Sequence, residues 1–223
     1  MVYYRHDRRG RCLAVAHVPA QDRRRSLVEA AIAVMTREGV RAATTRRVVE
    51  EAGASLAAFH YCFHSKDELI ESVIEQTNRE FLAWHTSPSP EAGTAKEAIE
   101  ISLRGLWSIT RDHPRRQAML FELTQYARRR ESLAHLAVKQ YADYYDTWVR
   151  FFVELTERFD VALAAPAENV ARFAVSVVDG LTFNYLIDRD DETAEGALAI
   201  AVESLSNQML PTKGRKPARR ATS

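Results

Sequence analysis

The segment at residues 44–66, TTRRVVEEAGASLAAFHYCFHSK, constrains the fold more than any other part of the chain. Thr44 and Ser55 each precede a short run with apolar residues at helical spacing. Their hydroxyls can accept hydrogen bonds from the first free backbone N–H groups of a helix. Gly53 separates the two runs, and glycine permits the backbone of a tight turn. The segment therefore predicts two short helices joined by a tight turn.

Two short helices in this order have the geometry of a helix-turn-helix. In that motif the second helix enters the major groove of DNA and the first crosses the backbone. Arg46 and Arg47 lie on the first turn of the leading helix. Further groups that can donate to phosphates are present at Thr44, Ser55, His60, Tyr61 and Lys66. The segment therefore predicts a DNA-binding surface.

Helical spacing of apolar residues continues on both sides of this segment. A preceding helix is expected from Asp22, as its cap, to Gly39, and a long one is expected after the cap Ser65. Further helices are predicted at residues 95–112, 115–130, 132–159, 167–187 and 193–209. No stretch shows the alternation of a strand bounded by turn signals. The predicted class is all-α, with about nine helices.

The net charge of +1 conceals an uneven distribution along the chain. Residues 1–66 carry 12 Lys+Arg and 6 Asp+Glu, whereas residues 67–210 carry 14 and 24. Residues 211–223 carry 5 basic residues and no acidic one. We expect the basic ends to face phosphate and the acidic middle to be repelled by it.

Other function classes lack their signals. Cys12 and Cys62 have no zinc-type spacing and fit a reducing cytoplasm. His60 and His64 are four residues apart, but a metal site is the weaker interpretation of that pair. No GxSxG, P-loop, GxGxxG or HExxH motif is present. We therefore expect no catalytic residue, no metal and no cofactor. No uninterrupted run of 18 apolar residues predicts a membrane span.

Residues 23–75 resemble the tetracycline-repressor-like (TetR-like) transcriptional regulators. The resemblance lies in the first-helix pattern LVEAAIAVMTREGVRAATT, the turn EEAGAS and the run FHYCFHSKDEL. The matching positions are Gly39, Thr44, Ala52-Gly53, Phe63 and Ser65-Lys66-Asp67. The resemblance implies that the first three helices bind DNA. It also implies that the remaining helices form a ligand-binding domain, whose last two helices pack against a second copy.

Four parts are expected on this basis. They are a basic, flexible arm (1–21), a DNA-binding domain (22–68, with the helix-turn-helix at about 44–63), a ligand-binding and dimerisation domain (69–210) and a basic, disordered tail (211–223). The arm is either a disordered or over-extended start, or a DNA contact that reaches phosphates or a minor groove through Arg5, Arg8, Arg9 and Arg11.

The resemblance implies a set of DNA-contacting positions. Arg46 would reach a base edge, where a guanidinium suits a bidentate contact to guanine, and Lys66 would anchor a phosphate. His60 stands where the family usually has a phosphate-binding tyrosine. It is either a pH-sensitive contact or a plain surface histidine. The whole set is Thr44, Thr45, Arg46, Ser55, Leu56, Ala57, Ala58, His60, Tyr61 and Lys66.

The first turn of the second short helix departs from the family pattern. It reads Leu56-Ala57-Ala58, where polar or glycine residues are common. These side chains cannot make hydrogen bonds, although they can contact thymine methyl groups. Base recognition would then depend mainly on Arg46, Tyr61 and DNA shape.

An aromatic band along residues 141–152 is either core packing or the wall of a ligand cavity. The cavity candidates are Trp107, Phe121, Glu122, Tyr126, Tyr145, Trp148 and Phe183. Aromatic walls with a carboxylate, Glu122 or Asp179, would suit a cationic or aromatic-ring ligand. The run FELTQYARRRESLAHLAVKQYADYYDTW is loosely similar to the effector domain of the BetI-like branch, and this likeness names no ligand.

The expected function is a dimeric, cytoplasmic DNA-binding regulator without a membrane partner. It would repress from a palindromic double-stranded operator and be released by a small-molecule effector. One alternative is an all-α enzyme. Another is a helical scaffold that has lost DNA binding, with Leu56-Ala57-Ala58 as the trace of that loss. The basic charge of residues 1–66 argues against the scaffold.

Overall fold

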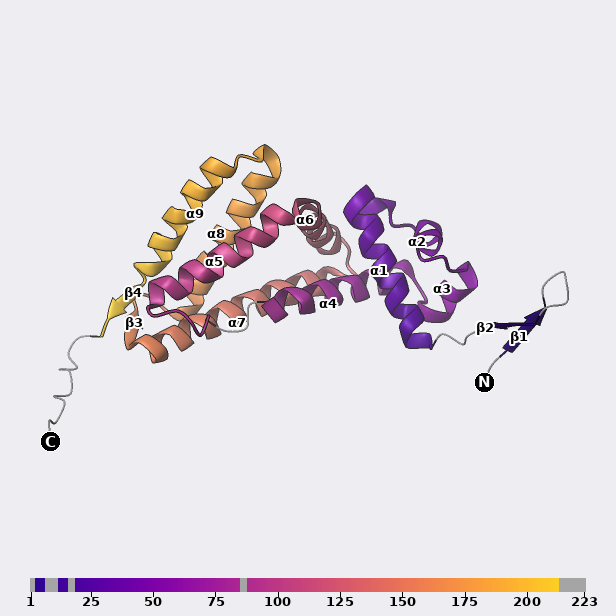
Figure 1. Cartoon of the computed structure of the whole chain (residues 1–223), viewed down its shortest axis with the longest axis horizontal. Coiled ribbons are helices and arrows are strands. Elements are labelled where there is room, and N and C mark those ends of the chain that lie inside the picture. The colour runs from indigo at the N-terminus through magenta and orange to yellow at the C-terminus, as the bar shows by residue number, and fades with distance from the viewer. Residues whose placement is uncertain (1–2, 7–11, 16–18, 85–87, 213–223) are drawn as a thin grey trace, which may run out of the picture. The chain divides into compact units, whose positions relative to one another are not determined.

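The computed structural model describes residues 3–6, 12–15, 19–84 and 88–212 (Figure 1). Within these residues the chain forms nine α-helices, one 3-10 helix and four short strands. The predicted all-α class is confirmed. The chain divides into an N-terminal unit, Met1–Gln76, and a C-terminal unit, Thr77–Ser223. The boundary lies inside the helix α4 (Lys66–Trp84), whereas the sequence suggested it after residue 68.

The N-terminal unit is built from α1 (Ala20–Glu38), η1 (Val40–Ala42), α2 (Thr45–Glu51), α3 (Leu56–Cys62) and the first part of α4. Gly39 ends α1 with a φ of 89°, and Gly53 turns the chain between α2 and α3 with a φ of 59°. Both values lie in the left-handed region that glycine adopts without steric cost. The expected tight turn between two short helices is present.

Packing stabilises this unit, because α2 and α3 have only seven residues each. Helices of that length are not stable alone in water. Helix α1 lies against both, and they contact each other. Their apolar faces meet in a core of residues that are almost completely buried: Leu27, Ala31, Val34, Val48, Phe59, Phe63, Leu69 and Ile70.

The start of the chain differs from the sequence expectation. Helix α1 begins at Ala20 after Pro19, and Asp22 lies inside its first turn, where it accepts a hydrogen bond from Arg25 at 2.9 Å. The expectation that Asp22 caps the helix was wrong. The strands β1 (Tyr3–His6) and β2 (Cys12–Val15) pair antiparallel within the segment expected as a flexible arm. Arg8, Arg9 and Arg11 lie outside the described residues.

The C-terminal unit contains the end of α4 and five further helices. These are α5 (Ala95–Asp112), α6 (Pro114–Arg128), α7 (Ala134–Phe159), α8 (Ala167–Asp188) and α9 (Asp191–Ser206). Helix α8 packs along α7, and α9 packs on α5 and α8 (Figure 1). The best-buried side chains of their common core include Ile99, Leu103, Phe152, Leu155, Leu198 and Leu205.

Two short strands follow α7 and α9 and pair with each other. Strand β3 (Val161–Leu163) pairs antiparallel with β4 (Met209–Pro211), with Val161 opposite Pro211. The sequence predicted no strand, because these segments pair across a long separation and neither shows a local alternation. The pairing also includes Pro211, where the tail was expected to begin. Residues 213–223 of that tail lie outside the described residues.

Helix α8 is, among the described residues, the one helix long and apolar enough to cross a membrane by length and composition. Its most apolar 18-residue window has a mean hydropathy of 1.3 and is 33% buried. The sequence predicted no such segment. A helix of a protein core passes the same test, and α8 packs against α6, α7 and α9. The remaining exposed apolar surface of α8 therefore needs another explanation.

Replacement of Phe152 by alanine should destabilise the C-terminal unit by about 3–5 kcal/mol, because it leaves a cavity where a fully buried ring packs against Trp148 and Phe151. The matched control is Val153→Ala on the same helix, where the side chain is 42% exposed. Urea unfolding followed by tryptophan fluorescence measures the change, because all three tryptophans (84, 107 and 148) lie in this unit. Equal unfolding midpoints for the two variants would contradict the described core.

Candidate functional site

Hydroxyl groups set the starts of three successive helices in the N-terminal unit. The Thr44 Oγ1 accepts the backbone N–H of Arg47 at 3.2 Å, and the Ser55 Oγ accepts that of Ala58 at 3.1 Å. The Ser65 Oγ accepts the N–H of Glu68 at 3.1 Å. Each bond satisfies a donor that the helix itself cannot satisfy. The caps inferred from the sequence are therefore present at α2, α3 and α4.

Most of the ten residues predicted to contact DNA lie on the surface. Tyr61 is 70% exposed and Leu56 is 44% exposed. The exposed members are Thr44, Arg46, Ser55, Leu56, Ala57, His60 and Tyr61, and the half-buried members are Thr45, Ala58 and Lys66. A surface of hydroxyls, one guanidinium and accessible aromatic and aliphatic groups is thus available to an outside partner.

The structure distinguishes the two adjacent arginines of α2. Arg47 is held by Glu38 at 2.8 Å, by Glu51 at 3.1 Å and by Glu50 at 3.5 Å. The hydrogen bond that Arg47 donates to Glu38 is the main cause that raises the Arg47 pKa. Arg46 is exposed and makes no hydrogen bond or ion pair with the residues that the structure describes. Arg46 is therefore available for an external anion or base, whereas Arg47 belongs to the scaffold.

Arg24 connects the end of α3 to α4, and sequence reasoning did not single it out. Its guanidinium donates to the Cys62 carbonyl at 2.6 Å, to Glu68 at 2.8 Å and to the Ser72 hydroxyl at 2.9 Å. It also lies 4.1 Å from the centre of the Phe63 ring. The bond from Arg24 lowers the pKa of Glu68, and the His64 N–H adds to that effect. No local motif signals these contacts, because the partners lie far along the chain.

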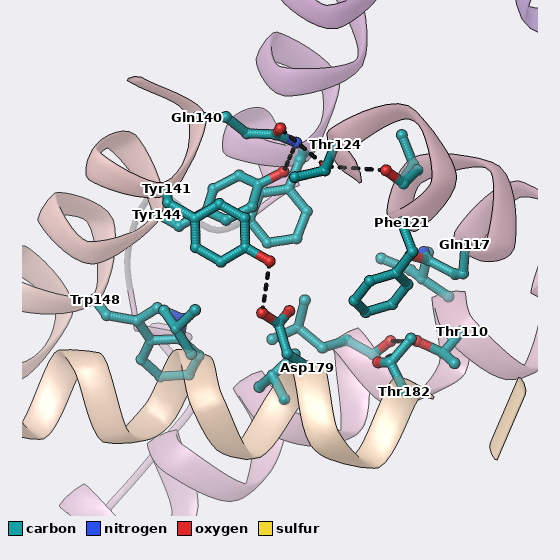
Figure 2. Close-up of a pocket in the computed structure, with 16 residues that line it drawn as sticks. Thr110, Gln117, Phe121, Thr124, Gln140, Tyr141, Tyr144, Trp148, Asp179 and Thr182 are labelled. Atoms are coloured by element: carbon teal, nitrogen blue, oxygen red, sulfur yellow. Dashed lines mark hydrogen bonds between the residues drawn. The ribbon is translucent and has the colours of Figure 1, made fainter. Parts of the chain in front are cut away.

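The C-terminal unit encloses a cavity of about 80 Å³ between α4, α5, α6, α7 and α8. Its walls are mainly aromatic and aliphatic, with a few hydroxyl and amide groups and one carboxylate (Figure 2). Aromatic rings come from Phe81, Phe121, Tyr141, Tyr144 and Trp148, and polar groups come from Thr110, Gln117, Thr124, Gln140, Asp179 and Thr182.

Two of the seven predicted cavity residues, Phe121 and Trp148, line this cavity. The other five are absent from its described walls. The Trp107 Nε1 donates to Glu195 at 2.9 Å, and Tyr145 lies beneath the Arg172 guanidinium at 4.5 Å. The Tyr126 ring lies beneath Arg130. Phe183 and Glu122 have exposed side chains.

Helical geometry explains which aromatic residues reach the cavity. Tyr141, Tyr144 and Trp148 are spaced by three and four residues, so they share one face of α7. Tyr145 directly follows Tyr144, and its ring lies beneath Arg172 instead. The sequence indicated the shared face within its aromatic band, but it could not say which face of α7 would meet α8. The sequence did not single out Phe81 as a cavity residue, although the ligand-binding domain predicted at 69–210 includes it.

Asp179 is the acidic group of the described cavity wall. The Tyr141 hydroxyl donates to its Oδ2 at 2.8 Å, and Figure 2 shows the carboxylate between Trp148 and Phe121. Burial raises the pKa of Asp179, and the bond from Tyr141 partly opposes that rise. Tyr144 accepts a hydrogen bond from Gln140 at 2.7 Å, and burial raises its pKa to about 12. Burial also raises the pKa of Tyr141, so the phenols of Tyr141 and Tyr144 are neutral near pH 7.

A wider hollow adjoins this cavity. The two share Phe81, Ile109, Gln117 and Leu120, and the hollow adds charged groups at Glu80, Asp112 and Arg116. Arg116 and Glu80 form an ion pair between α6 and α4. A ligand could thus approach the inner cavity past these shared side chains. Across the described residues, no cluster of three His, Cys, Asp or Glu side chains could hold a metal ion.

Comparisons with known proteins agree with both parts of the structure. The family model "Bacterial regulatory proteins, tetR family" matches residues 27–73, and "BetI-type transcriptional repressor, C-terminal" matches residues 95–210. The chain is 31% identical to the HTH-type nicotine-responsive transcriptional repressor HdnoR of Paenarthrobacter nicotinovorans, over 76% of this chain and 87% of that protein.

Two further similarities extend over most of the chain. The HTH-type transcriptional regulator BetI of Brucella melitensis biotype 2 is 27% identical over 84% of this chain and 91% of its own length. The crystal structure of a transcriptional regulator from Rhodococcus sp. Rha1 matches with a TM-score of 0.70 and 21% identity. It covers 83% of this chain and 97% of that one. The chain therefore belongs to the tetR family of DNA-binding transcriptional regulators, with a C-terminal domain of the BetI type.

Proposed function

We propose that the protein is a dimeric, cytoplasmic repressor that binds a palindromic operator and is released by a small molecule in the α4–α8 cavity. The observation that carries the proposal is a chain with both a capped α2–α3 pair that exposes Arg46 and Tyr61 and a separate cavity lined by Asp179. The match to a BetI-type repressor domain and the name of the nicotine-responsive relative support repression relieved by a ligand.

The roles on DNA follow from exposure and charge. Arg46 would read a base edge in the major groove, because its guanidinium is not engaged by the protein. Lys66, at the first position of α4, would bind a phosphate together with the hydroxyls of Thr44 and Ser55. Leu56, Ala57 and Ala58 would meet thymine methyl groups. Arg47 would not contact DNA, because three glutamates already hold it.

The last two helices would form the dimer interface. Helix α8 exposes Phe173 (44%), Phe183 (53%) and Ile187 (70%), and α9 exposes Ile200 (69%). Gly180 and Gly196 lie on the same helices, and an added Cβ at either would meet nothing within 4 Å. A second copy could therefore approach these backbones closely. Covering this surface would also explain why α8 is apolar enough to resemble a membrane span.

Helix α4 would couple the cavity to the DNA-binding surface. Its Phe81 lines the cavity, while its first turns carry Lys66 and bond through Arg24 to the end of α3. A ligand that displaces Phe81 would move a helix shared by both units. It would release DNA to the extent that it binds the displaced state more tightly. The scaffold without DNA binding remains the competing proposal, and salt-sensitive binding to a selected operator would eliminate it.

Arg46→Ala should weaken operator binding about 5- to 100-fold and relax the preference at one base pair, because a bidentate base contact is lost. Lys66→Ala should weaken binding to all sequences and reduce the salt dependence by about one counterion. The control Arg111→Ala removes the same charge from an exposed position in the last turn of α5. Fluorescence anisotropy with an operator selected from a random DNA pool measures all three. Unchanged affinity for both test variants would refute the site assignment.

Ile200→Asp should convert the dimer to a monomer and thereby reduce operator affinity, because it places a charge in the apolar α8–α9 surface. Val138→Asp on α7 is the matched control, since its side chain is 73% exposed and lies outside the last two helices. Sedimentation velocity gives the mass of each variant. A dimeric Ile200→Asp variant, or a monomeric Val138→Asp variant, would place the interface elsewhere.

A further inference from the structure

We propose that the cavity selects a small protonated amine, and that Asp179 accepts a hydrogen bond from the ligand's N–H. The inference deepens the proposed function by naming the chemical class of the effector. It concerns binding to the protein alone, so it is testable without DNA.

The described wall of the cavity carries one negative charge and no positive charge. Asp179 contributes a carboxylate, and none of the other residues described as lining the cavity is a lysine, arginine or histidine. Other carboxylates of the same unit have a cation beside them: Glu80 has Arg116, Glu195 has Arg104 and Asp143 has Lys139. Asp179 has the neutral phenol of Tyr141. A bound monocation would supply the missing charge.

Aromatic rings share the cavity wall with that carboxylate. The rings of Phe81 and Tyr144 lie 4.3 Å apart, and those of Tyr141 and Tyr144 lie 5.6 Å apart. Trp148 and Phe121 lie on either side of Asp179 (Figure 2). The negative faces of such rings attract a cation, and their carbon surface suits an apolar ligand body. Both parts of an organic amine therefore find a partner.

The hydrogen bonding of Asp179 favours a ligand with an N–H donor over a fully substituted ammonium group. The Asp179 Oδ2 accepts from Tyr141, while its Oδ1 accepts no hydrogen bond from the residues that the structure describes. Burial raises the pKa of this carboxyl group, because the surrounding protein disfavours its charged form. A charge-assisted hydrogen bond from the ligand stabilises that charged form. A quaternary ammonium ion has no N–H to give.

The cavity is small and carries further polar groups in addition to Asp179. A volume of about 80 Å³ lies below the several hundred Å³ that are typical of drug-sized sites, so a small ligand is favoured. The hydroxyls of Thr110 and Thr182 lie 3.3 Å apart on the cavity wall, and Gln117 adds an amide. These groups can bind a second polar substituent of the ligand.

Isothermal titration calorimetry of the purified full-length protein with three probes tests the inference. Cyclohexylamine and cyclohexanol have the same size and differ in charge, and tetramethylammonium is a smaller cation without an N–H. We expect cyclohexylamine to bind about tenfold or more tightly than either of the others, as a charged hydrogen bond requires. Equal affinity for amine and alcohol, tighter binding of tetramethylammonium, or no amine binding at millimolar concentration would overturn the proposal.

Substitutions locate the effect. Asp179→Asn should reduce cyclohexylamine affinity about tenfold and leave cyclohexanol affinity nearly unchanged. Tyr141→Phe should retain the preference for the amine, because the carboxylate remains. Glu122→Gln is the control, since it neutralises an exposed carboxylate on α6 that does not line the cavity. A preference that survives Asp179→Asn would overturn the role of Asp179. Operator affinity of the ligand-free variants, measured separately, reports on the proposed function.

Discussion

The recognition helix α3 depends on its neighbours for its existence, because seven residues cannot hold a helix in water. Burial of Phe59 and Phe63 fixes one face, and the Ser55 cap fixes the start. Arg24 fixes the end, because its guanidinium binds the Cys62 carbonyl together with Glu68 and Ser72 of α4. The exposed face of α3 is therefore presented by contacts that do not involve DNA, and α4 is part of that support.

A second constraint acts in the C-terminal unit, where α7 and α8 place a carboxylate among aromatic rings. Burial without a cation is unfavourable for Asp179, and one phenol satisfies it only in part. In the salt bridge between Arg104 and Glu195, by contrast, a positive charge lies beside the carboxylate. The buried carboxylate therefore makes the C-terminal unit less stable than a well-packed apolar side chain at the same position would. Such costs are common at binding sites. The same helix that carries Asp179 also exposes Phe173, Phe183 and Ile187.

The elements that the sequence predicted well are those with local causes. Thr44, Ser55 and Gly53 act on backbone groups within a few residues, so the α2–α3 turn was readable from the residues alone. The α5 helix at 95–112 was likewise predicted, because Thr94 caps it and its apolar face is regular. The failures have distant causes. Pro19, and not Asp22, occupies the capping position of α1. Strands β3 and β4 pair two distant segments whose sequences show no strand pattern.

The sequence by itself determined the helical class and the helix-turn-helix, because caps, spacing and turn residues act over short distances along the chain. The resemblance of residues 23–75 to known regulators indicated the family. Only the tertiary structure separated Arg46 from Arg47, revealed Arg24 as the link between α3 and α4, and turned Tyr141, Tyr144 and Asp179 toward one cavity while Trp107 and Tyr145 found other partners. The physical reason is that adjacent helical residues point about 100° apart. Which direction becomes a wall, a salt bridge or an open surface depends on the helix that packs there.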